Sequence, residues 1–164
     1  MKEIYTRRSI RKYTNQKVEK EKLIKLLDAA MNAPTAVNRQ EWRFVVVEEP
    51  SLLREIAEKM PNAHMVSGAS AALIVCGDCT VATAPEYIYV DCGAAIQNIL
   101  LMATKELLGA CWCTIGPSQD RIVSIKSLLN LPEEFLPVAC VAIGYPNEEK
   151  EENNRYDEEK VTWM

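Results

Sequence analysis

One long apolar stretch, residues 86–108, limits the folds that this chain can adopt. Its apolar side chains lie nearly all round a helix, which a helix at the edge of a monomer would not tolerate. We therefore expect a helix that is central in the fold or lies at a subunit interface. The most apolar runs, 69–76 and 92–103, are each too short to cross a bilayer, so no membrane span is expected.

Shorter elements are expected on both sides of this helix. Periodic apolar positions predict three further helices, over 18–31, 50–60 and 118–130, with Ser118 as an N-cap. Branched and aromatic runs predict four strands, over 42–47, 71–76, 110–115 and 136–144. Gly109 is expected to cap the long helix. A chain of 164 residues, 48% of them hydrophobic, is long enough for one domain that mixes these helices and strands.

The chain changes character after Pro146. Residues 147–154 are polar and carry no core-forming side chain, yet Tyr156, Val161 and Trp163 follow them. A solvated linker that ends in residues favouring burial predicts an arm that wraps another subunit. We therefore expect a single domain over 1–164, with 147–164 as linker and C-terminal arm, in a homodimer.

Composition excludes several classes of function. The net charge of -4 provides no basic field for a nucleic acid. The six glycines contain no G-x-G spacing, so the dinucleotide fingerprint and the Walker A loop are both absent. His64 is the only histidine, which excludes HExxH zinc chemistry, and no serine lies in a G-x-S-x-G elbow. Any chemistry is therefore expected to come from a cofactor.

The six cysteines favour a reducing compartment, because the chain shows no signal-peptide pattern at its start. We therefore expect a cytoplasmic protein with free thiols. Cys76 and Cys79 have C-x-x-C spacing, but no second such pair exists, so no metal site is predicted. The other cysteines are interpreted as small buried hydrophobic residues.

Two polar segments could carry chemistry. Arg7, Arg8, Ser9 and Arg11 place three guanidinium groups and a hydroxyl within five residues, which suits a phosphate clamp. The alternative is a solvated basic turn paired with surface carboxylates. Residues 33–40 offer a hydroxyl and two amides that could bind the edge of a heteroaromatic ring, or could simply bond the local backbone of a helix-to-strand connection.

These segments resemble the nitroreductase family of flavin enzymes. Residues 7–13, R-R-S-I-R-K-Y, are similar to its opening R-R-S-x-R-x-[FY], and residues 33–44 are similar to its A-P-[ST]-x-x-N-x-Q-x-W-x-F. Residues 91–101 resemble its D-x-G-x-A-x-Q-N-x-L-L helix, and T-I-G at 114–116 and Arg155 match further positions. The resemblance covers essentially the whole chain.

The resemblance implies an α+β fold with a mostly antiparallel central sheet flanked by helices, and a homodimer with exchanged C-terminal arms and FMN at the interface. It implies that the phosphate, ribityl chain and pyrimidine edge are held by Arg7, Arg8, Ser9 and Arg11, with Arg155 closing on the phosphate. It places the flavin ring and ribityl chain beside Pro34, Thr35, Asn38, Gln40, Thr114, Ile115 and Gly116. Gly116 is expected to leave room for an amide to approach flavin N5.

The implied reaction is ping-pong transfer of hydride from NADH or NADPH through flavin N5 to a small acceptor such as a nitroaromatic or a quinone. No catalytic side chain is expected, because solvent can supply the protons. Arg11 is expected near N1 and O2, where its charge favours the reduced flavin. Two alternatives stay open: an FMN carrier with little turnover, and a dehalogenase-type or flavin-destroying relative. The short segment between Cys76 and Asp91 favours an open or partner-supplied pocket.

Overall fold

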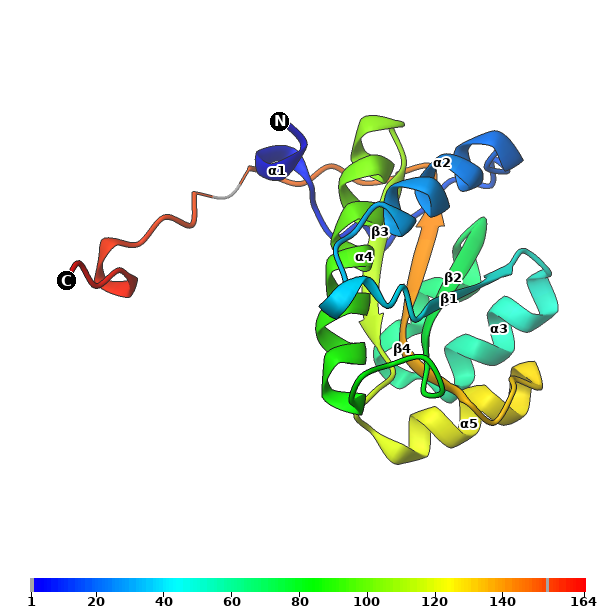
Figure 1. Cartoon of the computed structure of the whole chain (residues 1–164). Coiled ribbons are helices and arrows are strands. Elements are labelled where there is room, and N and C mark those ends of the chain that lie inside the picture. Colours follow the sequence, from blue (N-terminus) through cyan, green and yellow to red (C-terminus); the bar gives the residue numbers. More distant parts are fainter. Residues whose placement is uncertain (1, 153) are drawn as a thin grey trace.

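Four antiparallel strands form the middle layer of the fold in the computed structural model, which describes residues 2–152 and 154–164 (Figure 1). The strands are β1 (Trp42–Val47), β2 (Ala71–Asp78), β3 (Gly109–Thr114) and β4 (Phe135–Gly144), in the order β1-β2-β4-β3. Every residue of β2 is buried, because helices cover both faces of the sheet. The predicted antiparallel sheet is confirmed.

Helices cover both faces of the sheet (Figure 1). On one face α2 (Lys20–Met31) and α4 (Pro85–Lys105) form a core with Leu73 and Val141. On the other face α3 (Pro50–Lys59), α5 (Gln119–Leu129) and the 3-10 segment η2 (Pro61–Gly68) enclose Ile74 and Ala142. The long apolar helix α4 is therefore central, as its sequence predicts.

Several helix ends differ from the sequence prediction. The first long helix begins at Lys20, and the backbone N–H of Val18, two residues earlier, donates to Ser70 Oγ at 2.7 Å. The predicted role of Gly109 as a helix cap is wrong. Helix α4 ends at Lys105, Leu107 adopts the left-handed turn conformation with φ 61°, and Gly109 opens β3. A Cβ at Gly109 would lie 2.7 Å from Ile10 Cγ2, so its role is close packing.

Three short helices lie outside the predicted elements besides η2: α1 (Lys2–Thr6), η1 (Ala36–Asn38) and η3 (Glu158–Lys160). The C-terminal segment runs away from the sheet and ends beyond α1 (Figure 1). Tyr156 and Trp163 of this arm are exposed. Met1 and Asn153, which belong to the predicted domain and linker, lie outside the described residues.

The structure shows where the cysteines lie and how apolar the helices are. Five cysteines are buried, four on strands and Cys92 on α4, whereas Cys79 is exposed. Within the described ranges no three His, Cys, Asp or Glu side chains are arranged to hold a metal ion. None of the helices that the structure describes combines the length and the apolar character needed to cross a membrane.

Candidate functional site

A basic cluster, defined by Arg7, Arg8, Ser9, Arg11, Lys150 and Arg155, lies at the β3 edge of the sheet. Ser9 pairs with Ala110 in a parallel bridge, and the N–H of Ile10 donates to the Ala110 carbonyl at 3.0 Å. The cluster lines a cavity of about 510 Å³, to which Glu151 contributes the one acidic side chain. The structure thus brings together five of the predicted site residues in a strongly positive cavity.

The guanidinium of Arg8 is held by backbone carbonyls on both sides of the cluster. Its Nε donates to the carbonyl of Glu151 at 2.5 Å, and its Nη1 donates to those of Tyr5 and Arg7 at 2.8 and 2.6 Å. Its Nη2 is buried and has no hydrogen-bond partner among the described residues. A buried N–H group without an acceptor is costly, so this position fits an anionic oxygen such as that of a phosphate.

Crowding of like charges supports the same interpretation. Burial lowers the pKa of Arg7, and the positive charges of Arg155 and Arg8 lower it further. Lys150 is fixed beside them, because its Nζ donates to the Ser9 carbonyl at 2.6 Å and lies 3.4 Å from Glu148 Oε1. The N–H of Arg11 donates to Glu148, which lowers the pKa of that carboxyl. The cluster therefore has the donors and the excess charge to bind a phosphate group.

The second predicted segment, residues 34–40, connects α2 to β1 in an unusual backbone conformation. Val37, Asn38 and Gln40 all have φ of 54°, a conformation that is rare for residues other than glycine. The N–H groups of Asn38 and Gln40 donate to the carbonyl and hydroxyl oxygens of Thr35, both at 3.0 Å, and Gln40 Nε2 donates to Asn38 Oδ1. Local bonding therefore shapes the segment, while Pro34, Asn38 and Gln40 stay exposed.

The third predicted segment, residues 114–116, is held against strand β4. The N–H groups of Ile115 and Gly116 both donate to the Val138 carbonyl, at 2.9 and 3.1 Å. A Cβ at Gly116 would lie 2.6 Å from Tyr89 Cε1 and 2.8 Å from Tyr89 Oη. The Tyr89 ring therefore covers the side of Gly116 on which a Cβ would stand, and of the three residues only Thr114 is exposed. The expected approach of a flavin to this segment stays a prediction.

Helix α4 separates the basic cluster from the 34–40 segment within one chain. Arg8 shares a cavity with Thr104, which lies near the C-terminal end of α4. The N–H of Ala36, in contrast, donates to Oδ2 of Asp91, which lies in the first half of α4. The helical rise from Asp91 to Thr104 is about 20 Å. Along β3, Ala110 and Thr114 lie about 13 Å apart. Within one chain, the arginines of the basic cluster therefore lie beside Ser9 but away from the 34–40 and 114–116 segments.

The comparison with known proteins now decides the family. The model described as the nitroreductase family matches residues 4–78 and 80–145. The chain belongs to the nitroreductase family. It is 40% identical over 158 residues to a Methanothermobacter thermautotrophicus protein with the provisional name NADH dehydrogenase/NAD(P)H nitroreductase, covering 96% of this chain and 83% of that one.

Two solved structures extend this similarity to the whole fold of the family. One, from Bacteroides thetaiotaomicron and provisionally assigned the same name, has a TM-score of 0.94 at 40% identity and covers 99% of this chain and 95% of that chain. The other, a provisionally assigned nitroreductase from Desulfovibrio desulfuricans in complex with FMN, has a TM-score of 0.85 at 28% identity, with the same coverage of 99% and 95%. The fold implied by the sequence resemblance is confirmed.

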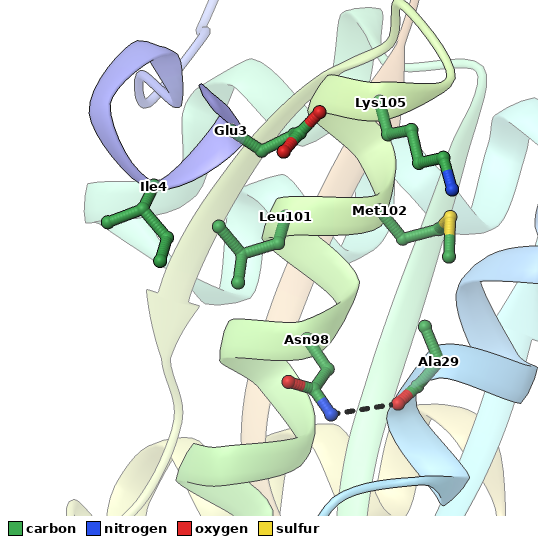
Figure 2. A pocket seen from close by; sticks show the side chains of 7 residues that line it. All are labelled: Glu3, Ile4, Ala29, Asn98, Leu101, Met102 and Lys105. Carbon is green, nitrogen blue, oxygen red and sulfur yellow. Dashed lines mark hydrogen bonds between the residues drawn. The ribbon is translucent and has the colours of Figure 1, made fainter. Parts of the chain in front are cut away.

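An apolar groove that the sequence reasoning missed lies among α1, α2 and α4 of this nitroreductase fold (Figure 2). Its volume is about 270 Å³, and its apolar lining includes Ile4, Leu101 and Met102. Asn98 on its floor donates through Nδ2 to the Ala29 carbonyl at 3.0 Å. The only sequence signal for the groove is the apolar character of α4 on its outer side.

Three further residues near the predicted segments were also missed. Lys150 completes the basic cluster but lies in a charge run that was interpreted as solvated. Glu41 is buried between the 34–40 segment and β1, and Tyr89 covers Gly116. A possible signal for Glu41 was its position as a charged residue directly before the apolar run of β1. No local signal exists for Tyr89.

Proposed function

We propose that this protein is a reductase that takes hydride from NADH or NADPH and passes the electrons to a small acceptor such as a nitroaromatic or a quinone. The protein is an FMN-dependent NAD(P)H oxidoreductase of the nitroreductase family. The observation that carries the proposal for this chain is the buried, unpartnered Arg8 Nη2 within a cluster of like charges. That position fits the phosphate of FMN.

The residues of the basic cluster hold the cofactor by charge and by directed N–H groups. Arg7, Arg8 and Arg155 bind the phosphate, and Ser9 lies beside them. Arg11 provides a positive charge for the pyrimidine edge of the ring. When bound, FMN accepts hydride at N5 and passes electrons to the acceptor. No side chain of the chain is assigned a proton transfer.

A site built by two copies of the chain accounts for the separation along α4. In a homodimer, the 34–40 segment of one copy can lie over the basic cluster of the other. The face that would be covered carries exposed apolar side chains on α4, in the groove of Figure 2 and on the arm: Tyr87, Val90, Ile4, Tyr156 and Trp163. We therefore propose a homodimer with exchanged arms, located in the cytoplasm.

Removal of residues 156–164 is expected to weaken the dimer. The truncation keeps Arg155 but deletes Trp163, whose side chain is 84% exposed in the single chain. Burying such a side chain contributes about 2 kcal/mol, so we expect the dissociation constant of the dimer to rise at least about tenfold. Sedimentation across a concentration series measures this constant, with Val123→Ser on α5 as an exposed control. A wild-type chain that sediments as a flavin-loaded monomer contradicts the homodimer.

Replacement of Arg11 by alanine is expected to make the bound flavin harder to reduce. Two-electron reduction places negative charge on N1 and O2, which a guanidinium stabilises. Loss of about 1.4 kcal/mol of that interaction lowers the midpoint potential of a two-electron couple by about 30 mV. A dye-coupled reductive titration measures the potential, and Arg54→Ala on α3 is the control. An unchanged potential would place Arg11 away from the flavin ring.

The direct test of the proposed activity is oxidation of NADH or NADPH with and without added FMN, in the presence of a quinone or a nitroaromatic. The proposal expects FMN-dependent oxidation that the acceptor accelerates. Tight FMN binding without oxidation of either donor would instead support the carrier function. Turnover only with a halogenated acceptor would support the dehalogenase-type alternative.

A further inference from the structure

Two buried carboxyl groups face each other beside the 34–40 segment. Glu41 precedes β1 and is 1% exposed, and Asp91 on α4 is 6% exposed. Their side chains lie within hydrogen-bonding reach of each other. Among the residues that the structure describes, no N–H group donates to either carboxyl oxygen of Glu41 with good geometry, although its own backbone N–H lowers its pKa. A hydrogen bond between two carboxyl groups requires that one of them carries a proton.

The charged and titratable groups around the pair do not neutralise it. Arg43 is the nearest cation, but its guanidinium donates to Asp78 Oδ2 at 2.9 Å and to the carbonyls of Gln40 and Trp42. Cys92 follows Asp91 on α4, and its thiol donates to the Cys76 carbonyl. Burial, with smaller effects of Cys76, Glu41 and Asp91, raises the pKa of this thiol, so it stays neutral. Burial and Asp91 raise the pKa of Glu41. A shared proton is therefore the way in which the pair avoids two buried negative charges.

The same pair holds both ends of the strained segment. At its start, Asp91 Oδ2 accepts the N–H of Ala36 at 2.7 Å. At its end, the carbonyl of Glu41 accepts the N–H of Asp78 at 2.8 Å, while its side chain reaches Asp91. Between these points, Val37 has the left-handed φ of 54°, which a β-branched residue adopts only when its surroundings impose it. Asp91 on α4 thus binds both ends of the segment to the helix, while the hydrogen bonds to Thr35 shape the segment between them.

We propose that Glu41 and Asp91 share one proton and act as positioning residues that hold the 34–40 segment in the conformation that binds FMN. This inference rests on the proposed function, because it assigns the segment to the cofactor site. When the proton is lost, two carboxylates repel each other in a dry environment and the segment separates from α4. FMN affinity therefore falls as the pair ionises.

The sign of the pH dependence follows from the direction of the pKa shift. The folded protein holds the Glu41 proton more tightly than the unfolded chain, for which the ordinary pKa is 4.5. The proton on Glu41 therefore contributes its full share to the free energy of unfolding at low pH. This contribution is lost as the pH rises above 4.5 and through the raised pKa of the folded state. Glu41→Gln has an amide N–H that donates to Asp91 at every pH, so it removes this loss.

The experiment measures the FMN dissociation constant by fluorescence quenching from about pH 5, just above the ordinary pKa of 4.5, to about pH 9. The phosphate of FMN titrates near pH 6 in the same way for every variant, so the ratio of the constants between variants isolates the carboxyl pair. We compare wild type, Glu41→Gln and the control Glu58→Gln, which replaces an exposed glutamate on α3. Over this range we expect the constants of wild type and of the control to rise together, by at least about tenfold relative to that of Glu41→Gln, because one unit of pKa shift corresponds to about a tenfold change. Parallel profiles for all three proteins would overturn the proposal.

Asp91→Asn provides a second variant in case the first folds poorly. Its amide oxygen can still accept the Ala36 N–H, and its amide N–H can donate to an ionised Glu41, so its profile should follow that of Glu41→Gln. Urea unfolding of the apoprotein over the same pH range tests the pair without cofactor. Wild type that binds no FMN at any pH would contradict the proposed function, whereas equal pH slopes of unfolding in wild type and Glu41→Gln would contradict the shared proton.

Discussion

Replacement of Gly77 by alanine is expected to lower the free energy of unfolding by about 3 kcal/mol. Gly77 lies in β2 where α4 crosses the sheet, and a Cβ there would lie 2.2 Å from Ile88 Cγ2 and 2.9 Å from Ile88 Cγ1. Ile88 is fully buried, so its side chain has no free volume into which it can rotate. The substitution therefore pushes α4 away from the sheet.

Urea denaturation of the variant and of wild type measures this change. Gly68→Ala is the matched control, because a Cβ at Gly68 meets no atom within 4 Å and the residue is exposed at the end of η2. We expect the control to change stability by less than about 0.5 kcal/mol. A Gly77→Ala protein as stable as the control would contradict the close packing of α4 on β2.

Replacement of Arg7 by glutamine is expected to raise the FMN dissociation constant by about tenfold to a hundredfold. A hydrogen bond to a charged group contributes about 1.5 to 3 kcal/mol, and the crowded arginines give the cavity its affinity for phosphate. Loss of one guanidinium also relieves the repulsion from Arg8 and Arg155, so folding stability should not fall. Fluorescence quenching by titrated protein measures the constant.

Two controls separate phosphate binding from other effects of this change. Arg54→Gln removes an exposed arginine on α3, far from the cluster in the fold, and should leave FMN binding unchanged. Riboflavin lacks the phosphate, so wild type and Arg7→Gln should bind it equally. If Arg7→Gln weakened riboflavin as much as FMN, the basic cluster would not be the phosphate site.

The strands and main helices could be predicted because their signals are local. The branched runs at β1 and β2 and the apolar periodicity of α2, α3 and α4 reflect burial that each segment requires by itself. Helix ends were less accurate, because the turn after α4 uses a left-handed leucine at 107, where the sequence favours Gly109. Gly109 lies in β3 instead, because Ile10 packs closely against it. This contact is between residues far apart in the chain, so the local sequence does not report it.

The candidate site was predictable only as far as its motifs extend. Arg7, Arg8, Ser9 and Arg11 are adjacent in sequence, and the structure places Arg155 beside Arg7 as the family resemblance implies. The Glu41 and Asp91 pair joins two elements that are fifty residues apart, so no local pattern reports it. The contact of Tyr89 with Gly116 is equally non-local, because it joins α4 to the segment that follows β3.

The central claim is that this chain binds FMN and reduces it with NADH or NADPH. An anaerobic absorbance spectrum of the purified protein supplied with FMN, recorded before and after each donor is added, tests it most directly. We predict a bound oxidised flavin spectrum that bleaches with at least one donor and returns when a quinone is added. Bound flavin that resists both donors, or no bound flavin at all, would contradict the account.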